Sequence, residues 1–123
     1  MLVSPAQRRI WRQRRQEAIA SAQARERAAR RLAAQAASRL RQGWPGIEGV
    51  WLFGSVAEGR TQSSSDIDLA VAGLPPEALL TARAELDNLA AARQAPFIPI
   101  DLVCLESLPP HWQQRIRERA IVL

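Results

Sequence analysis

Residues 50–71 read VWLFGSVAEGRTQSSSDIDLAV, and this stretch decides the fold. A short apolar run ends at Phe53, and the pair Gly54–Ser55 follows it before a polar loop begins. After the loop, apolar residues alternate with other residues at the period of two that a β-strand requires. Asp66 and Asp68 are therefore expected on one face of a second strand, with their carboxylates pointing the same way.

The length of the loop predicts how these two strands pair. About ten residues separate Ser55 from Asp66, too few for the crossover of about a dozen or more residues that joins parallel strands. We therefore expect an antiparallel pair, in which the end of the first strand lies beside the start of the second. The Gly54–Ser55 turn would then meet Asp66 and Asp68 in space.

A third strand is predicted over Ile98–Leu105, where an acidic residue interrupts an apolar run. The helical pattern over Pro75–Arg93 separates it from the second strand, so these two strands should be parallel with a right-handed crossover. Asp101 lies early in the third strand and is expected beside Asp68. The remaining elements are a last helix from about Pro109 to Arg119 and a short edge strand over Ile121–Leu123.

The first third of the chain reads as one long helix. Ser4 can cap it, Pro5 suits its first position, and Gln7 completes a capping box. Gly43 and Pro45 are expected to end it. A helix of about 38 residues would be roughly 57 Å long, which exceeds the diameter of a globule of this size. Part of it must therefore bend back, protrude or pack on something else.

The apolar stripe on this helix is strong in its second half and thin in its first half. The second half carries Leu32, Ala33, Ala36, Ala37 and Leu40, and the first half carries Ile10, Trp11, Ala18, Ile19 and Ala22. We therefore expect residues 1–25 to form a basic helical extension and residues 26–123 to form the catalytic domain. Trp11 lies in the thinly apolar part and marks a candidate interface.

Positive charge is concentrated in the same helix. Residues 1–42 hold 11 arginines against two glutamates, whereas residues 43–123 hold six arginines against ten acidic residues. Every basic side chain is arginine, apart from one histidine. An arginine-rich helix is more often a solvated face than a nucleic-acid reader, and this one has no interleaved aromatic residue beyond Trp11.

Length and composition exclude several classes of protein. The 123 residues suit a single domain. Cys104 is the only cysteine, so no internal disulfide can form and a cytoplasmic protein is expected. No stretch of about 18 apolar residues occurs, so we predict neither a membrane span nor a signal peptide. Trp44, Trp51 and Trp112 are expected in packing positions, and His111 is expected to be exposed.

The acidic residues predict a metal site. Two carboxylates two residues apart on a strand lie roughly 6–7 Å apart at the backbone and repel unless a cation lies between them. Oxygen ligands of this kind suit magnesium, whose shell is completed by water and substrate phosphates. Three carboxylates can hold two metal ions about 3.5–4 Å apart. The pattern thus predicts magnesium binding by Asp66, Asp68 and Asp101.

The turn at Gly54–Ser55 is a candidate phosphate site. Backbone N–H groups at such a turn can bind an anion, and glycine lets the backbone approach a phosphate closely. The Ser55 hydroxyl adds a donor, and Arg60 is within reach of a phosphate from the loop. The segment Thr61–Ser65 is small and polar, as expected of the wall of a nucleotide site.

The stretch Leu52–Val71 resembles the signature of the DNA polymerase beta-like nucleotidyltransferase superfamily, and especially that of the minimal nucleotidyltransferases, small single-domain proteins of bacteria and archaea. The matching features are Gly54–Ser55, Ala57, Gly59 and the run Ser65-Asp66-Ile67-Asp68-Leu69. The segment PIDLVCLESLP (Pro99–Pro109) is similar to the one that carries the third acidic residue. The resemblance covers about Leu32 to Leu123.

The resemblance implies a mixed α/β (α+β) fold, in which a small mixed sheet of three to four strands is flanked by helices, as in a nucleotidyltransferase palm. It implies that Asp66 and Asp68 bind two magnesium ions, and that Asp101 binds metal and helps to deprotonate the acceptor. The resemblance implies that Gly54 and Ser55 bind the phosphates of the nucleoside triphosphate, and we expect Arg60 and Ser65 to bind it with them.

The implied activity is transfer of a nucleoside monophosphate, AMP from ATP, to a hydroxyl group. Minimal nucleotidyltransferases often pair with a small helical HEPN protein, an RNase toxin, and resemble antitoxins that adenylylate it. A HEPN-type partner is therefore expected, and a homo-oligomer is a further option. Two alternatives stay open: a catalytically weak module that neutralises its partner by contact, and a nucleic-acid-binding protein that acts through the arginine-rich helix.

Overall fold

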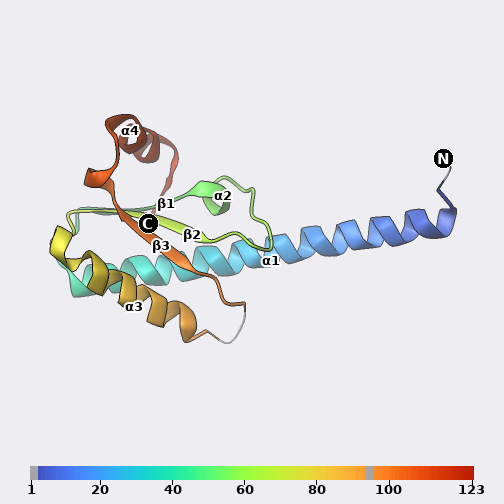
Figure 1. Ribbon diagram of the computed structural model, residues 1–123, viewed down its shortest axis with the longest axis horizontal. Coiled ribbons are helices and arrows are strands. Elements are labelled where there is room, and N and C mark those ends of the chain that lie inside the picture. Colours follow the sequence, from blue (N-terminus) through green and yellow to red (C-terminus); the bar gives the residue numbers. More distant parts are fainter. Residues whose placement is uncertain (1–2, 94–95) are drawn as a thin grey trace.

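The chain folds as one small sheet with helices on both faces and one helix that runs far beyond it (Figure 1). The computed structural model describes residues 3–93 and 96–123. Its elements are α1 (Pro5–Gly43), β1 (Gly49–Phe53), α2 (Gly54–Ala57), β2 (Ile67–Ala72), the 3-10 turn η1 (Pro76–Ala78), α3 (Leu79–Ala91), β3 (Ile100–Cys104), the 3-10 turn η2 (Leu105–Ser107), α4 (Pro110–Arg119) and β4 (Ile121–Val122).

The sheet has the strand order β3-β2-β1-β4. β1 pairs with β2 in antiparallel orientation, β2 pairs with β3 in parallel, and β4 pairs with the outer edge of β1. The predicted fold class and the predicted pairing of the three main strands are therefore confirmed. The register also sets Asp68 opposite Phe53 on one side and opposite Asp101 on the other.

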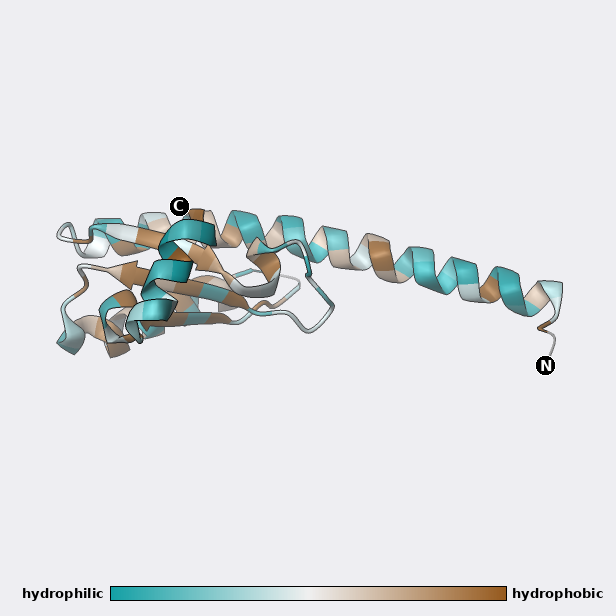
Figure 2. Cartoon of the chain, turned by 90° about the horizontal axis from the view of Figure 1, so that it is seen from above, coloured by the Kyte–Doolittle hydropathy of each residue, from teal (hydrophilic) through white to brown (hydrophobic). Residues whose placement is uncertain are grey.

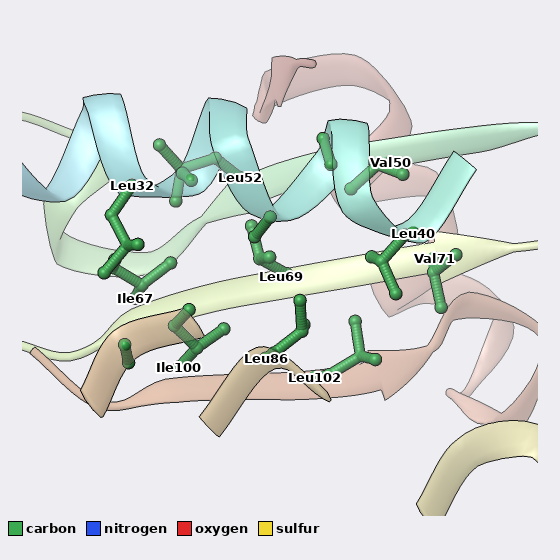
Figure 3. Packing of buried hydrophobic residues seen from close by; sticks show 14 of the residues in the cluster. Leu32, Leu40, Val50, Leu52, Ile67, Leu69, Val71, Leu86, Ile100 and Leu102 are labelled. Atoms are coloured by element: carbon green, nitrogen blue, oxygen red, sulfur yellow. The ribbon is translucent and has the colours of Figure 1, made fainter. Parts of the chain in front are cut away.

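The larger core lies between the sheet and the helices α1 and α3. Ile67, Leu69 and Val71 point from β2 into this core, as their alternation predicts, and meet Leu32 and Leu40 of α1 (Figure 3). Each of these side chains is fully buried. Removing an apolar surface of this size from water is the main source of stability in so small a domain.

The opposite face of the sheet carries a smaller core under α4. Trp51, Ala70 and Ala72 point to this side and pack with Leu105 and with Ile116 of α4. Because Asp68 and Ala70 are two residues apart on β2, the Asp68 carboxylate projects from the same face as this smaller core. The helices α1 and α3 lie on one face of the sheet and α4 lies on the other (Figure 1). The Asp68 carboxylate thus shares its face with α4.

The long helix is continuous and protrudes. The predicted capping box is present, since the Gln7 backbone N–H donates to Ser4 Oγ and the Ser4 backbone N–H donates to Gln7 Oε1, each at 3.1 Å. Burial along α1 begins at Ala28. The preceding turns extend past the sheet and are mostly hydrophilic (Figure 2). Of the three outcomes considered for its length, protrusion is the one observed.

Some details differ from the sequence-based expectations. Trp112, expected in a packing position, is 44% exposed. It lies in the first turn of α4, and the buried residue of this helix is Ile116, one turn further on. The helix expected over Pro75–Arg93 starts as a 3-10 turn and then becomes α3. β3 begins at Ile100, two residues later than expected. His111 is exposed, as predicted, and Cys104 is buried.

No helix among residues 3–93 and 96–123 combines the length and the apolar character needed to cross a lipid bilayer.

Candidate active site

The turn from β1 into α2 is built around a glycine. Gly54 has φ of 80°, a backbone conformation that L side chains rarely adopt. A Cβ atom at this position would also overlap Oδ2 of Asp68. Glycine is thus required twice, for the backbone angle and for the close approach of the Asp68 carboxylate to the turn. The predicted meeting of this turn with Asp68 is observed.

The two serines of the candidate site are also close to each other. Ser55 Oγ donates to Ser65 Oγ at 3.2 Å, and the Gln62 backbone N–H donates to the same Ser65 oxygen at 2.8 Å. These bonds link the start of α2 with the end of the loop that leads to Asp66. The end of the loop is therefore held against the start of α2 by hydrogen bonds.

Asp68 is the electrostatic centre of the acidic group. Its burial raises the pKa of the carboxyl, and the negative charges of Asp101 and Asp66 raise it further. Asp66 and Asp101 are exposed, whereas Asp68 is half-buried. Asp101 and Asp66 are thus both close enough to act on the Asp68 carboxylate, which agrees with the register that sets Asp68 opposite Asp101.

The acidic residues have the chemistry to bind a divalent cation, but their side chains are not arranged as a preformed metal site. Within the described residues, no three His, Cys, Asp or Glu side chains lie together in a geometry that could hold a metal ion. The donors are nevertheless hard carboxylate oxygens, which magnesium prefers. A cation between them would relieve the repulsion that raises the pKa of Asp68.

Side chains from α1 support the site loop. Arg25 donates from Nε and an Nη atom to the Ser65 carbonyl oxygen at 3.1 and 2.9 Å. Thr61 Oγ1 donates to Glu26 Oε1 at 2.9 Å, and Arg30 donates to the Val56 carbonyl oxygen at 3.2 Å. This role of α1 was not predicted from the sequence, because no motif marks a contact between residues 26 to 40 positions apart.

Arg60 lies apart from the carboxylates. It donates a hydrogen bond to Glu58, and this bond and the positive charge of Arg60 lower the pKa of Glu58, with smaller contributions from Arg115 and Arg119. Arg60 and Gly54 line a pocket of about 240 Å³ between α2 and α4. Of the residues predicted to bind nucleotide, Gly54 lies against Asp68, and the hydroxyl groups of Ser55 and Ser65 bond to each other. Arg60 lines the pocket that Gly54 also borders.

Comparison with known families and structures agrees with this geometry. Residues 36–123 match the family model of the polymerase beta nucleotidyltransferases. No curated protein matches the chain. The matched range covers the turn, all three carboxylates and α4, and it agrees with the extent of the resemblance inferred from the sequence.

Three solved structures are similar in fold. A toxin–antitoxin structure with AMP-PNP is 32% identical, covers 68% of this chain and has a TM-score of 0.51; the chain spans 64% of the length of that chain. A chain assigned as a minimal nucleotidyltransferase is 28% identical, with 85% of this chain and 95% of that chain covered and a TM-score of 0.50.

The third structure supports the fold alone. It is assigned as a nucleotidyltransferase from Sulfolobus solfataricus, is 18% identical, covers 83% of this chain and 85% of that chain, and has a TM-score of 0.51. With the family match over residues 36–123 and the Gly54–Ser55 turn facing the carboxylates, these likenesses lead to one conclusion. The chain belongs to the polymerase beta-like nucleotidyltransferase family and is of the minimal nucleotidyltransferase type.

Proposed function

We propose that this protein transfers AMP from ATP to a side-chain hydroxyl of a partner protein, as the antitoxin of a HEPN-type toxin–antitoxin pair. The observation that carries the proposal is the row formed by Asp101, Asp68 and the Gly54 turn across three adjacent strands. In a member of the nucleotidyltransferase family, such a row can bind a triphosphate and an acceptor side by side.

The residues of the row have separate roles in this proposal. Asp66, Asp68 and Asp101 would hold two magnesium ions, which neutralise phosphate charge and lower the pKa of the acceptor hydroxyl when bound. Gly54 and Ser55 bind the phosphates through backbone N–H groups and the Ser55 hydroxyl. Ser65 holds Ser55 in place through the bond between their hydroxyl groups.

The reaction itself is a displacement at the α-phosphorus of ATP. Asp101 accepts the proton of the acceptor hydroxyl, whose oxygen then forms a bond to the α-phosphorus. The bond from that phosphorus to the bridging oxygen breaks, and pyrophosphate leaves with the electron pair. General-base action of this kind contributes about 10²–10⁴-fold to a rate.

A protein acceptor suits this fold because the domain has little of its own to orient a substrate. Asp66, in the loop just before β2, and Asp101, on β3, are both exposed. Docking two protein surfaces would position the hydroxyl and reduce the entropic cost of the reaction. The protruding half of α1, with Ile10, Trp11 and Ile19 about half exposed, is a candidate docking arm. The similar toxin–antitoxin structure with AMP-PNP supports both the nucleotide and the type of partner.

The nucleotide part of the proposal is tested with variants of the carboxylates. Asp66→Asn combined with Asp68→Asn should abolish magnesium-dependent ATP binding, measured by calorimetry, while the protein stays folded. Asp87→Asn is the matched control, because Asp87 is exposed on α3, on the other side of the sheet. Equal ATP affinity in the double variant and the parent would contradict this part of the proposal.

The identity of the acceptor is tested by locating the group that is transferred from labelled ATP. The protein is incubated with magnesium, labelled ATP, the product of the neighbouring gene and bulk RNA, and mass spectrometry then locates the label. Label on a protein hydroxyl supports the proposal, and Asp101→Asn should keep ATP affinity within a few-fold while slowing transfer by about 10²–10⁴-fold. Label on RNA alone, or on no protein at high enzyme concentration, rejects it.

A second candidate function is neutralisation of the partner by contact without turnover. The exposed Ile10, Trp11 and Ile19 on the protruding helix favour it, because they offer a binding surface that does not depend on the carboxylates. The double variant Asp66→Asn, Asp68→Asn separates the two functions. It should still protect cells from the partner if contact is sufficient, and should fail to do so if transfer is required.

A further inference from the structure

The pocket between α2 and α4 lies next to the proposed phosphate turn and is basic. It has a volume of about 240 Å³, and its lining includes Gly54, Arg60, Arg115 and Arg119. None of the three arginines belongs to the Gly-Ser turn or to the acidic group. The guanidinium of Arg115 lies over the ring of Trp112, 5.6 Å from its centroid, in a cation–π contact.

The position of the pocket follows the expected direction of the reaction. Across the sheet, Asp101 on β3, Asp68 on β2 and Phe53 on β1 form one row, and Phe53 and Gly54 border the pocket. In an in-line displacement the leaving group departs on the side opposite the attacking oxygen. If the acceptor hydroxyl approaches beside Asp101, pyrophosphate leaves across β1 toward the pocket.

The three arginines of the pocket all act on the carboxylate of Glu58. Arg60 bonds to Glu58, and the positive charges of Arg115 and Arg119 also act on Glu58, so the pKa of this exposed group is lowered. Arg60, Arg115 and Arg119 line the same pocket, and guanidinium groups bind phosphate through two parallel hydrogen bonds, so this lining can bind an anion with several oxygens.

We propose that Arg60, Arg115 and Arg119 form a subsite for the terminal phosphates of the triphosphate and for the pyrophosphate that leaves. Glu58 acts there as an internal counterion that competes with phosphate for Arg60. The subsite rests on the proposed nucleotidyl transfer for its role in the reaction. Its anion binding can be measured without transfer.

The first test removes the charge from α4. Calorimetry with magnesium pyrophosphate, ATP and AMP compares the parent with Arg115→Gln combined with Arg119→Gln. Affinity for pyrophosphate and ATP should fall by about tenfold or more, since each lost contact is a charged hydrogen bond. AMP affinity should change less than about threefold, because AMP lacks the terminal phosphates.

The control is a neighbouring arginine of the same helix. Arg117 lies over the ring of Trp51 at 5.4 Å and does not line the pocket. Arg117→Gln removes the same charge from α4 and should leave pyrophosphate affinity within about twofold. An equal loss in this control, or no loss in the double variant, overturns the proposed subsite.

The second test predicts tighter pyrophosphate binding, which a general loss of folding cannot produce. Glu58→Gln removes the competing carboxylate and should tighten pyrophosphate binding by about threefold or more. Unchanged or weaker binding in this variant counts against the role of Glu58 and overturns the proposal as stated.

The two proposals fail in distinguishable ways. If the parent transfers AMP and the Arg115→Gln, Arg119→Gln variant binds ATP and pyrophosphate equally well, the subsite is wrong and the transferase function stands. If pyrophosphate binding depends on these arginines and no acceptor is ever labelled, the anion site stands and the proposed transfer is wrong.

Discussion

At the scale of single residues, the charge on Asp68 opposes folding. The fold buries its carboxyl and sets it near Asp101 and Asp66, so its pKa in the folded state lies above the ordinary value of 3.8. In the pH range between these two pKa values, the folded state binds more protons than the unfolded state does. The contribution of Asp68 to stability is therefore lost as the pH rises through this range.

Replacing this carboxyl should stabilise the metal-free protein. We expect Asp68→Asn to raise the free energy of unfolding at pH 7 in the presence of a chelator, and the gain should vanish below about pH 3.8, where the carboxyl is protonated in both states. Urea titrations at pH 7 and pH 3 measure the difference. Asp87→Asn, on the far side of the sheet, should show no such gain; a gain of equal size there would mean that the effect is one of net charge.

Gly54 and Gly59 offer a matched pair of substitutions. Both have positive φ, of 80° and 72°, but a Cβ atom at Gly54 would overlap Asp68, whereas none of the atoms around Gly59 lies within 4 Å of the added Cβ. Alanine at either position should cost roughly 1–3 kcal/mol in backbone strain. Magnesium-dependent ATP binding should be lost only in Gly54→Ala. If Gly59→Ala loses it as well, the effect is strain and not displacement of Asp68.

At the scale of elements, α1 is both a core helix and a support for the site loop. Its second half fills the larger core, and Arg25 reaches the Ser65 carbonyl at the end of the loop. The predicted domain boundary between residues 25 and 26 lies at this contact. The boundary stays a prediction, and the tests below locate where the extension begins.

Arg25 should control the order of the loop more than the stability of the fold. We expect Arg25→Ala to cost about 1 kcal/mol of stability, the scale of one net hydrogen bond, and to increase amide exchange over residues 61–66. The KM for ATP should rise several-fold with a smaller change in kcat. Arg27→Ala is the control, because Arg27 is exposed on the same helix. Unchanged amide exchange in the Arg25 variant would remove the loop-supporting role.

The two halves of α1 should differ in their contribution to stability. The side chains of residues 4–20 are exposed, so deleting residues 1–20 should change the free energy of unfolding little, whereas Leu32→Ala should cost roughly 2–5 kcal/mol. Thermal unfolding at a concentration where both forms are monomeric compares them. A decrease of more than about 10 °C on deletion would show that the segment belongs to the core.

At the scale of the whole molecule, the arginine-rich part of α1 and the candidate active site lie in different places. Five arginines lie between residues 5 and 20 on the protruding part of α1, while Asp68 and the pocket lie on the face of the sheet under α4. A partner that docks on the helix can therefore be held without blocking the nucleotide. This separation predicts that docking and nucleotide binding are independent.

Deleting residues 1–20 tests that independence. In the proposed transfer reaction, kcat/KM for the protein acceptor should fall by about tenfold or more, since docked residues such as Trp11 are typical of those that dominate interfaces. ATP affinity of the isolated protein should stay within about twofold, because the phosphate turn and the carboxylates are untouched. Full transfer activity in the deletion variant would contradict the docking role of the helix.

The sequence by itself determined the elements and most of the topology of this protein. The capping box at Ser4, the alternation from Ile67 to Val71 and the short loop after Ser55 are local signals, and local geometry was enough to predict the helix, the strand faces and the antiparallel pair. From those pairings alone, Asp68 could be predicted to lie beside both Asp101 and the Gly54 turn, and the structure confirms both neighbours.

Only the tertiary structure decided what surrounds that row of residues. Arg25 and Ser65 are 40 positions apart, and Arg115 and Arg119 reach the neighbourhood of Glu58 from the far end of the chain. No period or turn signal encodes these contacts, because they depend on the direction in which α1 and α4 cross the sheet. That direction is chosen by packing of the whole core, through Leu32 and Leu40 on one face and Ile116 on the other.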